Sequence, residues 1–168
     1  KIKGCRVVGI AGSPAKCTYL TGIGCDAAID YHVPNLSAAI RAACPYGVDQ
    51  YFDNVGGLIK DAVFESLNPF ARVSSCGAIS SYNLAHLTPC RNWEWMIITK
   101  QIRIEGFISS RWIDSWPVAF ADMAQWIRAG KLTFEETFEH GFGSIINAFN
   151  KMMQGENTGK MVVVIKPN

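Results

Sequence analysis

The stretch Val7-Val8-Gly9-Ile10-Ala11-Gly12-Ser13-Pro14-Ala15-Lys16 carries the strongest local signal of fold in this sequence. Its apolar first half predicts a strand that is covered on both faces. Ser13-Pro14 then supplies an N-cap and a first-turn proline for a helix. The stretch therefore predicts a parallel strand that leads into a crossover helix.

The same alternation of strand and helix continues along the chain. Largely apolar runs predict core strands at residues 5–10, 27–30, 48–53, 71–75 and 102–108. Helical patterns lie between these runs, and an amphipathic helix is predicted at residues 114–129. A tail follows, with a short strand at 133–138, a helix at 144–153 and a final strand at 160–165. We expect an α/β fold with a Rossmann-type doubly wound parallel sheet.

The glycine-rich turn G-x-G-x-x-G, which normally follows the first strand of a dinucleotide-binding sheet, does not occur in the sequence. Residues 1–4 resemble the end of a helix that leads directly into the second strand of such a sheet. We therefore expect residues 1–130 to form an incomplete nucleotide-binding domain without its first strand and turn. Residues 131–168 are expected to be a C-terminal segment of the same protein.

The composition excludes several classes of protein. Hydrophobic residues make up 49% of the chain and charged residues 18%, which is typical of a packed globular protein. The formal net charge is only +2 and no basic run adds to it, so neither a nucleic-acid nor a membrane-surface partner is expected. No apolar stretch is long enough to span a bilayer.

The cysteines and histidines do not form a recognisable metal site. Six cysteines are scattered without a C-x-x-C pair. We expect free thiols in a reduced, cytoplasmic protein, although an even count also allows three disulfides. The three histidines stand far apart, so no metal is expected at His32, His86 or His140.

No catalytic residue can be assigned from spacing. Cys76 lacks a histidine in a sequence relation that implies a nucleophilic pair. A hydrolytic acid–base pair is likewise not recognisable among Asp53, Glu94 and Glu105.

The strand end at Ala11-Gly12-Ser13 indicates the type of cofactor. NAD-specific sites place an acidic residue there to accept from both ribose hydroxyls, and this sequence has none. Lys16 offers an ammonium group in the first turn of the helix, and the helix N-terminus with Ser13 adds donors, which favours a 2′-phosphate and hence NADPH. A capped helix with a solvent-facing lysine would have the same local pattern.

Two further loops follow predicted strands. They are Tyr51-Phe52-Asp53-Asn54-Val55-Gly56-Gly57 and Ser74-Ser75-Cys76-Gly77-Ala78-Ile79-Ser80-Ser81-Tyr82-Asn83. Because open parallel sheets bind ligands at the carboxyl ends of their strands, we expect both loops to face one crevice, with the Asn54 amide pointing into it. Either loop alone would also fit a plain strand-to-helix connection.

Four stretches in order give the sequence a specific resemblance. Besides the two loops, they are Ala11-Gly12-Ser13-x-x-Lys16 and Gly155-Glu156-Asn157-Thr158-Gly159-Lys160. Over essentially its whole length the chain resembles the alkenal/prostaglandin reductases, a zinc-independent branch of the medium-chain dehydrogenase/reductase superfamily.

The resemblance implies roles for individual residues. Lys16 and Tyr31 match positions at the 2′-phosphate end of NADPH, and Asn54, Cys76 and Gly77 match positions along its nicotinamide half. Together with the local pattern, the expected cofactor-binding residues are Gly12, Ser13, Lys16, Tyr31, Asn54, Cys76, Gly77, Phe107, Ile108, Ser109 and Asn157.

Two residues bear on the substrate. Tyr82 matches a tyrosine that lines the substrate cleft in the family. Thr99 stands where some members carry a tyrosine implicated in binding the substrate carbonyl. This departure argues against prostaglandin-like substrates.

The activity that the resemblance implies is NADPH-dependent reduction of the carbon–carbon double bond of α,β-unsaturated aldehydes or ketones, with a small-molecule enone or enal as substrate. This chain would be the cofactor-binding part of that oxidoreductase and inactive by itself. Quinone reduction and a non-catalytic nucleotide-binding module are the alternatives. The family's dimers also imply a homodimer that forms through an edge strand at residues 103–108.

Overall fold

The computed structural model of the chain describes residues 1–86 and 91–165. It contains two compact units. One unit is Arg6–Trp116, and the other combines Lys1–Cys5 with Pro117–Asn168.

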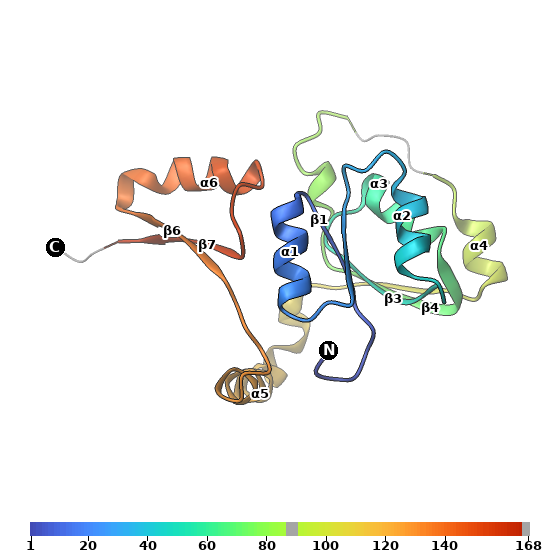
Figure 1. Cartoon of the computed structure of the whole chain (residues 1–168), viewed down its shortest axis with the longest axis horizontal. Coiled ribbons are helices and arrows are strands. Elements are labelled where there is room, and N and C mark those ends of the chain that lie inside the picture. The colour runs from blue at the N-terminus through green and yellow to red at the C-terminus, as the bar shows by residue number, and fades with distance from the viewer. Residues whose placement is uncertain (87–90, 166–168) are drawn as a thin grey trace. The chain divides into compact units, whose positions relative to one another are not determined.

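The Arg6–Trp116 unit alternates strands with helices from its beginning (Figure 1). Its elements in chain order are β1 (Val8–Ala11), α1 (Pro14–Gly22), β2 (Ala27–Asp30), α2 (Leu36–Ala43), β3 (Val48–Asp53), α3 (Gly57–Phe64), β4 (Leu67–Ser75), α4 (Glu94–Thr99) and β5 (Arg103–Gly106). Every strand pair in the unit is parallel. The predicted Rossmann-type architecture is confirmed.

The strands of this unit form two separate sheets. β1 pairs with β2, and β3, β4 and β5 form a second sheet in that order. Among the described residues, no pairing joins β1 to β3. This separation agrees with a doubly wound sheet that lacks the strand with the glycine-rich turn.

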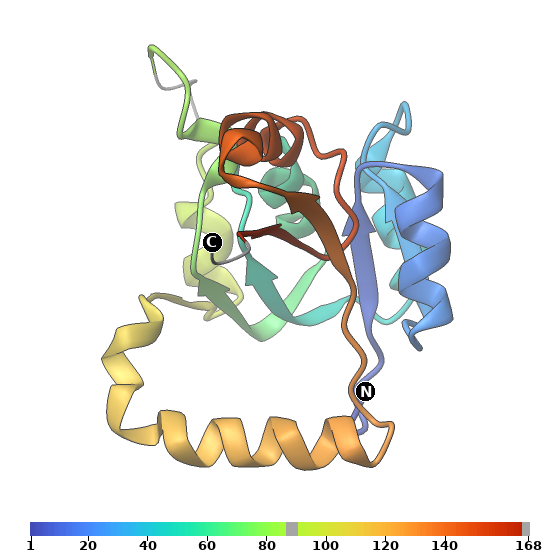
Figure 2. The same cartoon turned by 90° about the vertical axis from the view of Figure 1, so that its left-hand side faces the viewer.

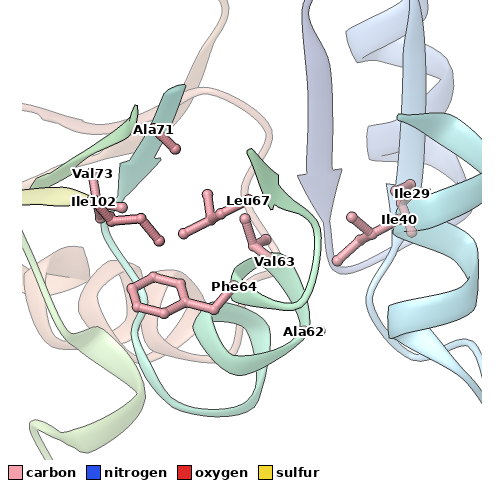
Figure 3. Packing of buried hydrophobic residues seen from close by; sticks show 9 residues of the cluster. All are labelled: Ile29, Ile40, Ala62, Val63, Phe64, Leu67, Ala71, Val73 and Ile102. Atoms are coloured by element: carbon pink, nitrogen blue, oxygen red, sulfur yellow. The ribbon is translucent and has the colours of Figure 1, made fainter. Parts of the chain in front are cut away.

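The hydrophobic core lies between the sheets and their helices. Its buried members are Ile29, Ile40, Ala62, Val63, Phe64, Leu67, Ala71, Val73 and Ile102. Figure 3 shows the side chains of Phe64, Leu67 and Ile102 pointing toward one another. Ile40 and Leu67 are almost fully buried, and burial of a side chain of this size contributes roughly 1.5–3 kcal/mol to folding. α2 contacts both β2 and α3, and α3 contacts β3, so these two helices connect the core of the two sheets.

Several predicted boundaries are shifted. β1 begins at Val8 rather than at residue 5, while Cys5 belongs to the other compact unit. β4 begins at Leu67 rather than at residue 71, and its pairing with β3 contains an irregularity beyond Val48. Phe70 has a φ of 64°, which marks the kink that lets the strand continue past Pro69.

The other unit contains α5 (Trp116–Arg128), whose first residue lies at the boundary, and then β6 (Glu136–His140), α6 (Ile145–Met153) and β7 (Lys160–Val164). Figure 2 shows α5 as one continuous helix. β6 and β7 are parallel, and α6 connects them. An ion pair of 2.6 Å between Lys151 Nζ and Glu139 Oε1 joins α6 to β6.

The free thiols include Cys5, Cys17, Cys25, Cys44 and Cys76, whereas Cys90 lies outside the described residues. Within residues 1–86 and 91–165, no helix combines the length and the apolar character needed to cross a membrane.

Candidate functional site

The carboxyl end of β1 leads into a capped helix. Ser13 has an extended backbone and is the N-cap of α1, and its Oγ accepts from the Lys16 backbone N–H at 3.3 Å. The first turn of α1 contains Pro14 and no acidic residue. This helix end therefore presents the positive end of its dipole with no carboxylate in its own first turn.

Tyr31, which follows β2, lies beside the carboxyl end of β1. Its backbone N–H donates to the Ala11 carbonyl at 3.0 Å. Its ring lies against the α-carbon of Gly12, where an added Cβ would be 2.7 Å from the Tyr31 hydroxyl oxygen. The structure thus brings Gly12, Ser13 and Tyr31 together, with Lys16 in the first turn of the adjoining helix.

Asp53 organises the turn at the end of β3. Its carboxylate is buried, and Oδ1 accepts from the backbone N–H groups of Val55 and Gly56 at 3.0 and 2.9 Å. The Tyr51 hydroxyl donates to the same oxygen at 2.9 Å. Burial of that hydroxyl, and after it the negative charge of Asp53, raises the pKa of Tyr51 well above its usual range.

Asn54 is held against the loop that follows β4. The Cys76 thiol sulfur lies 2.6 Å from Asn54 Oδ1. The backbone N–H groups of Cys76 and Gly77 donate to the Asp53 carbonyl at 2.9 and 3.2 Å. The predicted residues Asn54, Cys76 and Gly77 therefore form one surface at the carboxyl edge of the β3–β4–β5 sheet.

Position 77 has room only for glycine. A Cβ there would be 2.9 Å from the Asn54 carbonyl oxygen and 3.2 Å from the Tyr82 hydroxyl oxygen. The Tyr82 hydroxyl accepts from the Ala78 backbone N–H at 3.0 Å, so the tyrosine closes the loop over Gly77. Ser80 fixes the loop further, because its Oγ donates to the Val55 carbonyl at 2.6 Å.

Phe107, Ile108 and Ser109 follow β5 directly. The Phe107 N–H donates to the Ser75 carbonyl at 3.1 Å, which places this segment beside the residue that precedes Cys76. Ile108 is 77% exposed, an unusual state for an isoleucine at a strand end. The segment can therefore offer an apolar surface and backbone groups to a flat ligand.

Two further residues from the sequence analysis make hydrogen bonds within their own segments. Asn157 belongs to the other compact unit, where its Nδ2 donates to the Gly159 carbonyl at 2.7 Å. Thr99 is the last residue of α4, and its hydroxyl donates to the Trp95 carbonyl of its own helix at 2.8 Å.

Sequence reasoning missed the role of Asp53, which it considered only as an acid or a base. The available signal was an aspartate at a strand end followed by Val55-Gly56, a pattern typical of a turn in which the side chain accepts backbone hydrogen bonds. His32, which the sequence analysis considered only as a possible metal ligand, lies next to Tyr31 and pairs with Asp30. Within the part of the chain that the structure describes, no group of three or more His, Cys, Asp or Glu side chains could hold a metal ion.

Comparison with known proteins gives consistent matches. The sequence profile described as zinc-binding dehydrogenase matches residues 1–126. YfmJ of Bacillus subtilis is 46% identical over 170 residues, which cover 98% of this chain and 50% of YfmJ. Prostaglandin reductase 1 of Rattus norvegicus is 42% identical over 165 residues, which cover 97% of this chain and 50% of the rat protein.

A solved structure matches as well. CurA of Vibrio vulnificus in complex with NADPH superposes with a TM-score of 0.92 at 36% identity, over 99% of this chain and 51% of CurA. The chain thus spans about half the length of the proteins that it matches.

Proposed function

Because the chain belongs to the zinc-binding dehydrogenase family, in its zinc-independent medium-chain reductase branch, we propose that it is the NADPH-binding part of an oxidoreductase. The proposed reaction reduces the carbon–carbon double bond of α,β-unsaturated aldehydes or ketones. Since the chain spans half the length of its relatives, this activity is proposed for the protein at its full natural length.

The observation that carries the proposal is the packing at the end of β1. The Tyr31 ring fills the space over Gly12, where a side chain would collide with it. An acidic residue that would select NAD is therefore both absent and sterically disfavoured at this position. The first turn of α1 and the Lys16 ammonium group suit a 2′-phosphate instead, and CurA, which is 36% identical, is described in complex with NADPH.

The nicotinamide half of the cofactor would lie along the second group of residues. Asn54, Cys76 and Gly77 are held together by hydrogen bonds, and the lack of a side chain at Gly77 leaves the backbone open to a close approach. We place the carboxamide end beside Phe107, Ile108 and Ser109. Asn157 is proposed as a further polar contact from the C-terminal segment at residues 131–168.

When bound, NADPH supplies the hydride that adds to the β-carbon of the substrate. The negative charge that develops on the carbonyl oxygen needs hydrogen-bond donors nearby. The Tyr82 hydroxyl accepts from Ala78 but can still donate, so this residue can offer its proton to the carbonyl oxygen of a bound substrate. Prostaglandin reductase 1, which is 42% identical, is by its name a reductase of prostaglandins.

The test measures NADPH consumption by the full-length protein with a panel of enones, enals and quinones. The proposal expects turnover of enones or enals with NADPH and much weaker turnover with NADH. Turnover of quinones alone would transfer the assignment to quinone reduction. Tight NADPH binding without any turnover would instead identify a nucleotide-binding module.

A further inference from the structure

The three residues at the end of β2 form a compact group beside the proposed phosphate site. Asp30 is the last residue of β2 and pairs in register with Ala11 of β1. The following Tyr31 N–H donates to the Ala11 carbonyl at 3.0 Å. The segment therefore leaves the sheet directly next to Gly12.

His32 contacts the Tyr31 ring. The two ring centroids are 4.3 Å apart, with an interplanar angle of 43°. Since the Tyr31 ring also lies against Gly12, it is confined between the backbone of one strand end and the imidazole of its neighbour. Movement of His32 would free the ring that covers the end of β1.

His32 is also bonded to an acid. The His32 backbone N–H donates to Asp30 Oδ1 at 3.0 Å, and the ring Nδ1 lies 2.9 Å from the same oxygen. Since an ionised carboxylate only accepts, Nδ1 carries the proton of the neutral ring, and a second proton would add at Nε2. The backbone hydrogen bond from His32, and after it the interactions with the His32 side chain, lower the pKa of Asp30 below its usual range.

This geometry places a permanent negative charge close to the site where a phosphate is expected. Such a charge weakens phosphate binding unless a cation offsets it. The imidazole of His32 is in direct contact with that carboxylate, with Nδ1 2.9 Å from Asp30 Oδ1. Its side chain is 64% exposed, so it can exchange protons with solvent.

We propose that His32 is a positioning residue for the 2′-phosphate end of NADPH. The neutral and the protonated imidazole both hold the Tyr31 ring in place. The protonated imidazole also offsets the negative charge of Asp30, so that NADPH binds more tightly relative to NADH. The inference rests on the proposed function, because it assumes that NADPH binds at this end of β1 and β2.

The pH window follows from the groups around His32. Histidine ordinarily titrates near pH 6.5. Asp30 remains ionised throughout this range because its pKa is lowered. From α1, Cys17 has a pKa that is raised by burial and then by the charge of Asp30, so its thiol stays neutral.

The 2′-phosphate itself gains a proton near pH 6, as phosphate monoesters do, and this weakens NADPH binding as the pH falls. A variant comparison removes this background. The affinities for NADPH and NADH are measured by fluorescence titration of the full-length protein at about pH 6.5 and about pH 8. His32→Gln removes the titratable charge, His32→Lys makes it permanent, and His140→Gln removes a histidine from β6 in the other compact unit.

The NADPH-to-NADH affinity ratio of the wild-type protein should exceed that of His32→Gln by about two- to fivefold at the lower pH and by less at the higher pH. His32→Lys should have a higher NADPH-to-NADH affinity ratio than His32→Gln at both pH values. His140→Gln should have the same ratio as the wild-type protein at each pH. Equal ratios for the wild-type protein and His32→Gln at both pH values would overturn the inference while leaving NADPH binding intact. A wild-type protein that does not bind NADPH would overturn the proposed function as well.

Discussion

The ring of Tyr31 rests on the α-carbon of Gly12, so closely that a methyl group at position 12 would lie 2.7 Å from the tyrosine hydroxyl oxygen and 2.9 Å from Cζ. This contact joins the ends of β1 and β2. It also occupies the position at which an NAD-specific site would carry its acidic side chain. We therefore propose that the choice of cofactor depends on the packing of this aromatic ring.

Replacing Gly12 with alanine should displace the Tyr31 ring and weaken NADPH binding, because the added Cβ takes the space of the ring. The free energy of unfolding should change by less than about 1 kcal/mol, since Tyr31 is 41% exposed and can move outward. NADPH titration and urea unfolding measure the two effects. Gly22→Ala is the matched control, because nothing lies within 4 Å of a Cβ at position 22. An unchanged NADPH affinity in Gly12→Ala would contradict the assignment.

Reversing the charge of Lys16 should weaken NADPH binding more than NADH binding. Loss of one charge-assisted contact costs about 1.5–3 kcal/mol, which corresponds to roughly 10- to 150-fold in affinity. Titration of Lys16→Glu with both cofactors provides the comparison. Lys131→Glu makes the same change of charge in the other compact unit. Equal losses for the two cofactors would reject a phosphate contact at this residue.

Alanine at position 77 should impair the nicotinamide side of the site. Its Cβ would be 2.9 Å from a backbone oxygen of Asn54, which cannot move aside as a side chain can. We expect weaker NADPH binding and a lower rate of hydride transfer, measured by single-turnover oxidation of NADPH. Gly143→Ala meets nothing within 4 Å and is the matched control. Normal turnover in Gly77→Ala would show that the cofactor does not approach this loop.

Tyr51 should make the fold sensitive to alkaline pH. The pKa of Tyr51 is raised in the folded state, whereas the unfolded chain ionises near the ordinary tyrosine value of about 10. The stability that this residue contributes is therefore complete below about pH 10 and is lost as the pH rises above it. Urea unfolding at about pH 8 and about pH 11 should show a larger loss for the wild-type protein than for Tyr51→Phe. Tyr46→Phe, at a residue that is 86% exposed, should behave like the wild type.

The outer strand β5 should mediate dimerisation. Among the described strands it pairs only with β4, so its other edge is open, and Ile104 is 45% exposed. An open edge with apolar side chains favours pairing with a second chain. Ile104→Pro should convert a dimer to a monomer in sedimentation, because proline removes a donor and disrupts the edge. The matched control is Ile104→Thr, which keeps the strand and should preserve the dimer. Ile146→Pro would not serve as a control, because Ile146 lies within α6. A dimeric Ile104→Pro would exclude this interface.

The order of the elements and the lack of an acidic residue at the end of β1 could be predicted from the sequence alone. The predicted strands at residues 27–30 and 48–53 coincide with β2 and β3, and Ser13-Pro14 begins α1 as predicted. These features depend on local signals, namely apolar runs, a capping side chain and a proline at the first turn. The lack of an acidic residue at Ala11-Gly12-Ser13 is equally visible in the sequence.

The contacts between side chains, by contrast, depend on the tertiary structure. Cys76 lies against Asn54, 22 residues earlier in the chain, and β4 extends back through Pro69 to Leu67 because that segment pairs with Val48 of β3. A local pattern predicts a break at Pro69, and only the long-range pairing overrides it. Likewise, the buried carboxylate of Asp53 and the placement of Tyr31 between Gly12 and His32 depend on the register of parallel strands. Register is fixed by the packing of the whole sheet and not by the periodicity of either strand, which is why the contacts among the proposed site residues could not be predicted from the sequence.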